Sequence, residues 1–279
     1  MRALLASILW TIAWWGFAWS KIPIASEYSF FPLWLGYIST LNTASELLYH
    51  DSLLRRMRGW FALLFIASIP FWWFFEWVNS YLQNWHYVFS HPISQLHYVV
   101  QASLDFSTVV PAVLSATFLF FRFFEARRIG KSRPSAIHSP WLALALAFGL
   151  ASFYLMQVFP RETFPLAWIA PFLILEPILY IGGAPSLLDQ IRKGDWTLTI
   201  SAMSATLVTG FFWELWNHYS LPKWYYTIPY VGFWKVFEMP ILGYAGYPFF
   251  GIIVLSYANA LSSLLRRNLV AALTHRPQA

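Results

Sequence analysis

The sequence contains the same ordered series of motifs twice, about 137 residues apart. The first series runs through Phe31-Pro-Leu-Trp, Glu46, Ser52-Leu-Leu, Phe75-Glu-Trp-Val-Asn and Trp85-His-Tyr. The second runs through Phe164-Pro-Leu-Ala-Trp, Glu176, Ser186-Leu-Leu, Trp213-Glu-Leu-Trp-Asn and Trp224-Tyr-Tyr. Because the motifs keep their order with only small changes of spacing, the sequence predicts a tandem duplication with two equivalent halves.

The composition places both halves in a membrane. Hydrophobic residues make up 58% of the chain and charged residues 11%, whereas soluble domains carry about 25% charged residues. Aromatic residues reach 21%, including 17 tryptophans, which is more than interfacial belts require. Such rings suit either packing between helices or a flat, apolar ligand, and composition by itself favours packing. There is no cysteine, which excludes disulfides, thiol chemistry and cysteine-ligated metals.

Eight segments are long and apolar enough to be membrane spans of about 20 residues. They cover residues 3–20, 29–49, 58–80, 97–121, 140–159, 163–183, 196–218 and 236–264. The sequence therefore predicts an all-α polytopic protein with eight transmembrane helices.

Positive charges gather in alternate connections between these spans. They are Arg55, Arg56, Arg58, Arg122, Arg127, Arg128, Lys131, Arg133, Arg192, Lys193, Arg266 and Arg267, with Arg2 on the same side. The positive-inside rule then predicts a multi-pass protein of a bacterial-type inner membrane with both termini in the cytoplasm. These arginines account for the net charge of +6, so nothing points to a nucleic-acid partner.

The chain is expected to divide at its basic connection. Residues 1–126 form the first four-helix repeat, 127–139 a basic cytoplasmic hinge, and 140–279 the second four-helix repeat. Since each repeat has an even number of spans, the two repeats have the same orientation and are related by a pseudo-two-fold axis along the membrane normal. A functional pocket is expected between them.

Glu76 and Glu214 are the strongest candidate catalytic residues, because ionisable groups within spans are costly and are commonly functional. Asn79 and Asn217 follow three residues later and share the helical face of the acids. Apolar surroundings favour the protonated form of a carboxyl, which could then act as an acid. The alternative is structural: Glu and Asn could cap the following loop or join helices.

Other acids have weaker claims. Glu46 and Glu176 are repeated near the basic connections, where ion pairs with Arg55–Arg58 and Arg192 are expected. Asp105 and Glu238 begin later spans and do not align between the halves. His86, His91, His97 and His218 lack metal-ligand spacing, so no metal or cofactor is expected, although a metal or haem at the outer-loop histidines stays an alternative. The absence of nucleotide-binding and serine-hydrolase motifs argues against nucleotide-driven transport and serine hydrolysis.

The segment 219–240 is rich in proline and aromatic residues and is expected to form a lid at the membrane surface. Within and before it, the series Glu214, Asn217, Trp224, Tyr226, Gly232 and Pro240 resembles the lycopene cyclase domain, the membrane-embedded carotenoid cyclases of bacteria and fungi. Glu76, Asn79, Trp85 and Tyr87 repeat it more faintly. The resemblance implies two same-sense helical repeats and protonation of a polyene without a redox cofactor.

The chain departs from that family. The acidic pair that the family places after its proline is absent, since Ile241-Leu242-Gly243 follows Pro240. The first acid is Glu where the family usually has Asp, and each repeat is predicted to have four spans instead of three. These departures place cyclisation in doubt.

Two functions remain open. The first is an enzyme, such as a lycopene-cyclase-like isomerase or lyase, that binds an isoprenoid, a carotenoid or another apolar lipid near the outer leaflet. Its candidate catalytic residues are Glu214, Glu238 and Glu76, and its candidate substrate-binding residues are Asn217, Asn79, Trp213, Trp216, Trp224, Tyr226 and Trp234. The second is a non-catalytic subunit of a membrane complex, or a carrier. Homo-oligomers and partner proteins are compatible with both.

Overall fold

The structure, a computed structural model, describes residues 1–275 and is mostly helical. The long helices are α1 (Arg2–Ser20), α3 (Phe30–Tyr49), α5 (Ala62–Leu82), α7 (Val109–Ala126), α8 (Ser139–Val158), α10 (Ala170–Ile181), α12 (Thr197–His218) and α13 (Gly246–Leu264). Shorter helices are α2 (Pro23–Glu27), α4 (Leu53–Met57), α6 (Gln95–Phe106), α9 (Pro160–Thr163), α11 (Leu187–Arg192) and α14 (Leu269–Thr274). The 3₁₀ helices are η1 (Arg58–Phe61), η2 (Phe164–Trp168) and η3 (Ile241–Ala245), and the strands are β1 (Trp85–Val88), β2 (Lys223–Tyr226), β3 (Lys235–Val236) and β4 (Met239–Pro240).

Six helical segments in the described part are long and apolar enough to cross a membrane: Arg2–Ser20, Leu53–Leu82, Gln95–Ala126, Ser139–Val158, Thr197–His218 and Ile241–Leu264. A pair of segments, Pro160–Trp168 and Ala170–Ile181, is bent by 40° and is a seventh span if it is counted as one. The predicted span 29–49 forms α3, which is as long as the others but less apolar. The chain is therefore a helical protein suited to cross a membrane several times.

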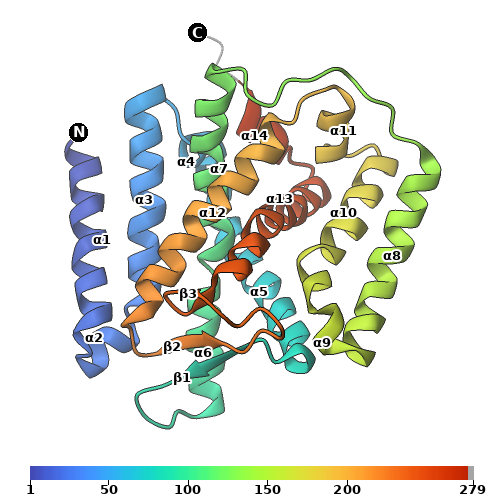
Figure 1. Ribbon diagram of the computed structural model, residues 1–279. Helices are drawn as coiled ribbons and strands as arrows, with labels where there is room; N and C mark the ends of the chain where they lie inside the picture. Colours follow the sequence, from blue (N-terminus) through green and yellow to red (C-terminus); the bar gives the residue numbers. More distant parts are fainter. Residues whose placement is uncertain (276–279) are drawn as a thin grey trace.

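Two outer helix pairs enclose a central group (Figure 1). Helices α1 and α3 pack together on one side, and α8 and α10 pack together on the other. Between them lie α5, α7, α12 and α13, with α12 packed against both α7 and α13. In α7, every residue from Val109 to Phe118 is buried in this centre. The largest buried surfaces therefore meet where α7, α12 and α13 cross.

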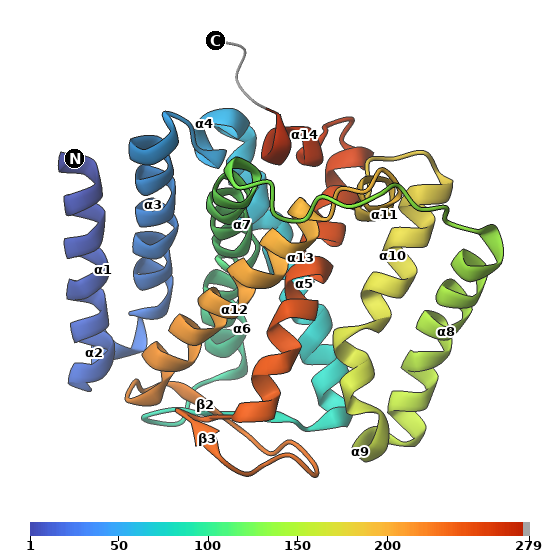
Figure 2. The same cartoon turned by 45° about the horizontal axis from the view of Figure 1, so that its top comes forward.

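The two ends of the molecule differ in structure. The N-terminus, α4, α11 and α14 lie at one end, and the strands and α9 lie at the other (Figure 2). At the strand end, β1 and β2 pair antiparallel, so that Trp85 lies opposite Tyr226 and Tyr87 lies opposite Trp224. The expected lid, 219–240, thus contributes strand β2 and the small β3–β4 pair. Its pairing with β1 joins the two halves of the chain.

The repeated Ser-Leu-Leu motifs begin short helices at the opposite end. The Ser52 hydroxyl accepts a hydrogen bond from the Arg55 backbone N–H at 3.2 Å, and the Ser186 hydroxyl accepts one from Asp189 N–H at 3.1 Å. Each serine is therefore the N-cap of its helix, a position where serine is favoured because its hydroxyl satisfies a free backbone N–H of the first turn. The sequence pattern thus corresponds to a local structure, the start of α4 and of α11.

The basic connection between the halves is held against the loop that precedes α12. Trp196 N–H donates to the Gly130 carbonyl at 2.8 Å, and Ser132 N–H donates to that of Gly194 at 2.8 Å. Both glycines have positive φ, 90° and 78°, and a Cβ on either would overlap the facing backbone. Lys131 also forms an ion pair with Asp195 at 2.5 Å. The segment predicted as a hinge is therefore attached to the second half.

Candidate functional site

A cavity of about 140 Å³ lies near the strand end, where both halves of the chain contribute to its wall. Its lining comes from α1, α2, α3, α5, β1, α6, η2, α12, β2, β4, η3 and α13. The lining includes seven tryptophans: Trp34, Trp72, Trp85, Trp168, Trp213, Trp216 and Trp224. The predicted ligand-binding residues Trp213, Trp216, Trp224, Tyr226 and Asn217 all line it.

The tryptophans form a continuous network across the interface between the halves. The ring centroids of Trp72 and Trp213 are 5.2 Å apart, and those of Trp34 and Trp216 are 5.0 Å apart. Tilted and edge-to-face rings at such distances attract one another and hold a rigid wall. This network contributes to helix packing and also shapes the cavity.

Glu214 is fully buried on α12, behind tyrosines of the cavity wall. Its Oε1 atom accepts hydrogen bonds from the hydroxyls of Tyr226 and Tyr247, both at 2.6 Å. The Trp224 indole N–H donates to the Tyr226 hydroxyl at 2.8 Å. Within residues 1–275, the Oε2 atom of Glu214 has no hydrogen-bond partner. Both tyrosines line the cavity, whereas Glu214 itself does not.

Glu76 occupies the corresponding place on α5. Its Oε1 atom accepts hydrogen bonds from Tyr87 at 2.5 Å, from Trp72 at 2.8 Å and from Trp85 at 3.0 Å. These three donors are cavity-lining residues, whereas Glu76 lies behind them. Each predicted acid thus accepts hydrogen bonds from aromatic side chains that line the cavity, Glu76 in the first half and Glu214 in the second.

One interpretation of the sequence expected Asn79 and Asn217 to hydrogen-bond the neighbouring acids. The structure shows other partners for both side chains. Each fastens the loop that follows its helix: the Asn79 amide donates to the Trp85 carbonyl, and the Asn217 amide donates to that of Trp224, both at 2.8 Å. Their side-chain oxygens accept backbone N–H bonds from Trp85 at 3.3 Å and Trp224 at 2.8 Å. The asparagines therefore set the position of β1 and β2, with only Asn217 reaching the cavity.

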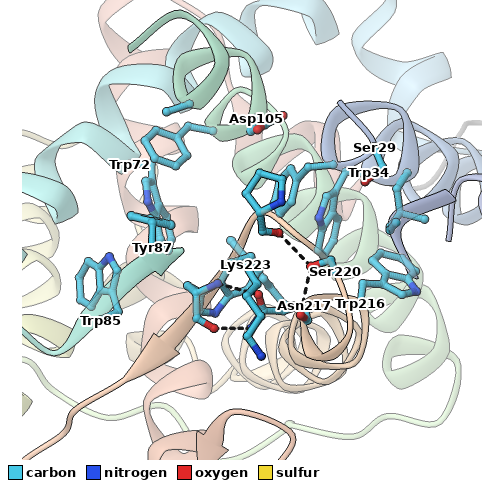
Figure 3. A pocket seen from close by; sticks show the side chains of 18 of the residues that line it. Ser29, Trp34, Trp72, Trp85, Tyr87, Asp105, Trp216, Asn217, Ser220 and Lys223 are labelled. Atoms are coloured by element: carbon cyan, nitrogen blue, oxygen red, sulfur yellow. Dashed lines mark hydrogen bonds between the residues drawn. The ribbon is translucent and has the colours of Figure 1, made fainter. Parts of the chain in front are cut away.

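Two carboxyls line the cavity directly, Asp105 on α6 and Glu27 at the end of α2. In Figure 3, Asp105 lies on the side of the cavity opposite Asn217, Ser220 and Lys223. The Asp105 carboxyl contacts the backbone of Phe31 at the start of α3, where helices have free N–H groups. Sequence reasoning noted Asp105 but did not assign it a role, because no partner repeats it in the second half.

Glu27 is a site residue that sequence reasoning missed, since no repeated motif contains it. It is 8% exposed, and its Oε1 atom lies 3.2 Å from Nε2 of His97. Its other oxygen lies 4.0 Å from Nδ1 of His91. Gln101 lines the cavity and donates to the Glu27 carbonyl at 2.6 Å. This cluster forms a polar margin of an otherwise apolar cavity.

Two other candidates lie away from the cavity lining. Trp234 is 80% exposed. Glu238 forms an ion pair with Lys223 at 2.5 Å and lies 3.7 Å from Nδ1 of His218. Lys223 itself borders the cavity, so Glu238 fixes the position of a lining residue.

The second repeated pair of acids differs between the halves. Glu46 forms the expected ion pair, with Arg55 at 2.7 Å. Glu176 does not pair with Arg192, which instead pairs with Asp189 at 3.0 Å. Glu176 is buried and accepts hydrogen bonds from the Ser256 hydroxyl at 2.7 Å and from Leu188 N–H at 3.1 Å. Its role is structural, joining α10 to α13 and α11.

The strand tyrosines are suited to donate hydrogen bonds. Burial, followed by the charge of Glu214, raises the pKa of Tyr226 well above its usual value. Burial and Glu76 raise the pKa of Tyr87 in the same way. Both hydroxyls therefore keep their protons near neutral pH.

No group of three or more potential metal ligands is present within residues 1–275.

Comparison with known proteins gives no match to a family model, to a curated protein or to a solved structure. The functional argument therefore rests on the geometry of the site.

Proposed function

We propose that this protein binds the end of an apolar isoprenoid or related polyene lipid in the tryptophan-lined cavity and isomerises it by acid–base catalysis. The observation that carries the proposal is the lining: seven tryptophans and few polar groups, among them Asp105 and two tyrosines anchored by carboxyls. Ligand sites combine apolar walls with a few convergent polar groups in this manner.

We infer that the halves are same-sense repeats and that the cavity lies near their pseudo-two-fold axis. Supporting this, a two-fold axis would make equivalent strands antiparallel, and β1 pairs with β2 so that each Trp lies opposite the Tyr of the other half. The Glu–Tyr and Asn–backbone hydrogen bonds also occur once in each half. On this basis α3 and the bent α9–α10 pair complete eight crossings, with the strand end outside the cytoplasm.

The cavity volume limits the part of a ligand that it encloses. An engineered cavity of about 150 Å³ binds benzene, so 140 Å³ corresponds to a ring or to one folded end of a polyene. A full polyene would extend beyond it into the membrane. The proposal is therefore recognition of an end group, not of a whole lipid.

The proposed reaction adds a proton to a terminal carbon–carbon double bond and forms a carbocation. The carboxylate left by the proton donor then takes a proton from a neighbouring carbon, which restores a double bond, so the reaction needs no oxidant or reductant. Tryptophan faces attract cations and would stabilise the intermediate. Tyr87 and Tyr226 would add their oxygen lone pairs, held in place by Glu76 and Glu214.

Asp105 is the proposed proton donor because its carboxyl lines the cavity, whereas Glu214 and Glu76 stand behind tyrosines. The competing role is structural, since Asp105 also contacts the start of α3. Asp105→Asn separates the two roles: the amide oxygen can still accept a backbone hydrogen bond, but the side chain is no longer an acid.

The test begins with the ligand. Lipids extracted from the purified protein are identified by mass spectrometry, and we expect an isoprenoid that Trp213→Ala loses and Trp141→Ala retains. Trp141 is the matched control because it is 68% exposed and lies outside the lining. Equal amounts of the same lipid in both variants would contradict a cavity site.

Catalysis is then tested with an acyclic carotenoid in proteoliposomes prepared in D₂O. Protonation of a carbon introduces deuterium into the product, and Asp105→Asn should lower its incorporation by about 100-fold. A ligand that binds but takes up no deuterium in the unmodified protein would favour the non-catalytic alternative.

A further inference from the structure

A second pocket, of about 840 Å³, lies at the opposite end of the molecule from the tryptophan-lined cavity. It lies between α4–η1 and the C-terminal helix α14, which pack side by side at the end that also holds the N-terminus (Figure 2). Four arginines line it: Arg55, Arg56, Arg58 and Arg267. His50 and His275 add two further groups that can bind anions.

Two of the arginines are engaged in structural contacts. Arg56 binds the buried Asp51 through two nitrogens, at 2.8 and 2.6 Å, and donates to the Ala272 carbonyl at 2.8 Å. It thereby fastens α14 to α4. Arg55 pairs with Glu46 at 2.7 Å on the exposed side. These contacts build the pocket wall.

The other two arginines leave a surplus of positive charge. The four arginines carry four positive charges, and Glu46 and Asp51 supply two negative charges that pair with Arg55 and Arg56. If the histidines are counted as neutral, two positive charges remain without a paired carboxylate. Arg58 and Arg267 form no ion pair within the described residues 1–275. Both are exposed, and the Arg267 guanidinium lies 5.9 Å from the centre of the Trp60 ring. An anion is the partner that this arrangement lacks.

The backbone of Arg58 is held in a costly conformation, with φ 51° and ψ −134°. Non-glycine residues rarely adopt such angles unless surrounding structure imposes them, and such sites are often functional. Here the strain is at the junction of α4 and η1, and it presents the Arg58 side chain at the pocket. The sequence predicted a topological role and ion pairs with Glu46 for the charges of this connection.

We propose that this pocket binds the phosphate group of an anionic lipid. Guanidinium groups recognise phosphate through paired N–H donors, and basic pockets at membrane-helix ends bind anionic headgroups. Leu54, Leu264 and Leu265, next to these arginines in sequence, are 48%, 79% and 57% exposed and suit contact with acyl chains. Trp60 lies near the N-terminal end of the candidate membrane-crossing segment Leu53–Leu82, and tryptophans are enriched at the ends of such segments.

The experiment measures lipid retention by the full-length protein in detergent, using native mass spectrometry. The probes are phosphatidylglycerol and phosphatidylcholine at equal concentration, with inorganic diphosphate as a soluble competitor. We expect at least a tenfold preference for phosphatidylglycerol, and its loss in Arg58→Gln/Arg267→Gln. Arg133→Gln is the matched control, since it removes positive charge from the other basic connection, outside this pocket.

The competitor separates two sources of the phosphate group. Displacement by millimolar diphosphate would identify a soluble phosphate compound as a ligand of the same site, and no displacement would identify the lipid itself. The proposal is overturned if the double Gln variant keeps the preference, or if Arg133→Gln loses it equally. If the Gln variant does not fold, Arg58→Lys/Arg267→Lys keeps the charge but removes paired donors, and it should reduce the preference severalfold.

Discussion

Tyr226 donates its hydroxyl hydrogen to Oε1 of Glu214 across 2.6 Å, and this bond places a buried carboxyl directly behind the wall of the cavity. Tyr247 donates to the same oxygen at the same distance. In the first half, Tyr87 makes the equivalent bond to Glu76, where two indole N–H groups also donate. The two acids therefore differ in how many donors remain when a tyrosine is lost.

This difference predicts unequal effects of removing one hydroxyl. Tyr226→Phe leaves Oε1 of Glu214 with one donor and should lower the free energy of unfolding by about 1–3 kcal/mol. Tyr87→Phe leaves Glu76 with two donors and should cost less. Thermal unfolding in detergent measures both, with Tyr244→Phe as the control because its hydroxyl donates to the Val236 carbonyl instead of to a carboxyl. Equal losses in the two halves would contradict the argument.

The Tyr226–Glu214 bond can also be tested as a pair. In a double-mutant cycle of Tyr226→Phe and Glu214→Gln, we expect the two losses to be non-additive by about 1 kcal/mol or more, because the first removes the donor and the second removes the charge that strengthens the same bond. In the proteoliposome assay, Glu214→Gln should lower turnover less than Asp105→Asn, since its carboxyl does not line the cavity. If Glu214→Gln lowers turnover more than Asp105→Asn does, Glu214 and not Asp105 would be the proton donor.

Asn79 and Asn217 provide a test of what positions the strands. Each amide satisfies backbone groups of the following loop, so Asn217→Ala leaves a buried carbonyl and a buried N–H without a partner. The expected loss of unfolding free energy is about 1–3 kcal/mol. Since β1 and β2 pair with each other, the Asn79→Ala and Asn217→Ala losses should not add. Hydrogen exchange at Trp85 and Trp224 would show whether the strands are released.

The sequence was informative about the fold where apolar composition and repeated motifs dominate. Helical segments cover most of each predicted span, including 29–49, but the last one, 236–264, begins with residues of strands β3 and β4, and the 163–183 segment is interrupted at Ile169 and bent. Six segments, or seven with this bent pair, are long and apolar enough to cross a membrane. Pro165 and Pro171 beside that break carried a signal for it, because proline disrupts continuous helix hydrogen bonding. The pairing of β1 with β2 was beyond sequence reasoning, because it joins segments far apart in the chain.

The candidate site was predicted in part for a similar reason. Asn217 and Trp224 recur in the first half as Asn79 and Trp85, and the aromatic content of the second half singled out the other candidates. Five of the predicted ligand-binding residues line the cavity: Trp213, Trp216, Trp224, Tyr226 and Asn217. Asn79 and Trp234 do not. Glu27 and Asp105 recur nowhere, so repetition gave them no weight, and only packing of α2, α3 and α6 brings them to the cavity. The spacing of Glu214 and Asn217 indicated a shared helical face. It did not indicate that Glu214 accepts hydrogen bonds from tyrosines or that Asn217 binds the backbone of Trp224.

Three glycines outside the long helices predict a graded series of stabilities. Gly183→Ala meets no neighbouring atom and should cost only the strain of its φ of 67°, about 1–2 kcal/mol. Gly194→Ala has a φ of 78° and would also place its Cβ against the Ser132 carbonyl, so it should cost more. Gly59→Ala has neither problem and is the control. Thermal unfolding should show the largest loss of stability for Gly194→Ala, a smaller loss for Gly183→Ala and the smallest for Gly59→Ala.

The Lys131–Asp195 pair predicts a pH dependence of stability at this connection. Burial of Asp195 opposes its charge, but hydrogen bonds from Lys131 and Thr197 outweigh it and lower the pKa of the carboxyl. With a folded pKa below the unfolded value of about 3.9, the contribution is present above that value and is lost as pH falls through the folded pKa. Asp195→Asn should therefore lower the melting temperature at pH 6 and have little effect near pH 3. A difference that persists at pH 3 would contradict this cause.

Orientation in the membrane is the remaining prediction, and it rests on the arginine-rich connections. All of them lie at the end with the N-terminus, α4, α11 and α14, and the strands lie at the other end (Figure 1). Single cysteines introduced into this cysteine-free chain should react with an impermeant maleimide from outside at residues 84–95 and 220–232. Cysteines at 127–133 and near the N-terminus should react only after the membrane is opened. Labelling of residue 130 in intact cells would reverse the orientation and place the tryptophan-lined cavity near the inner leaflet.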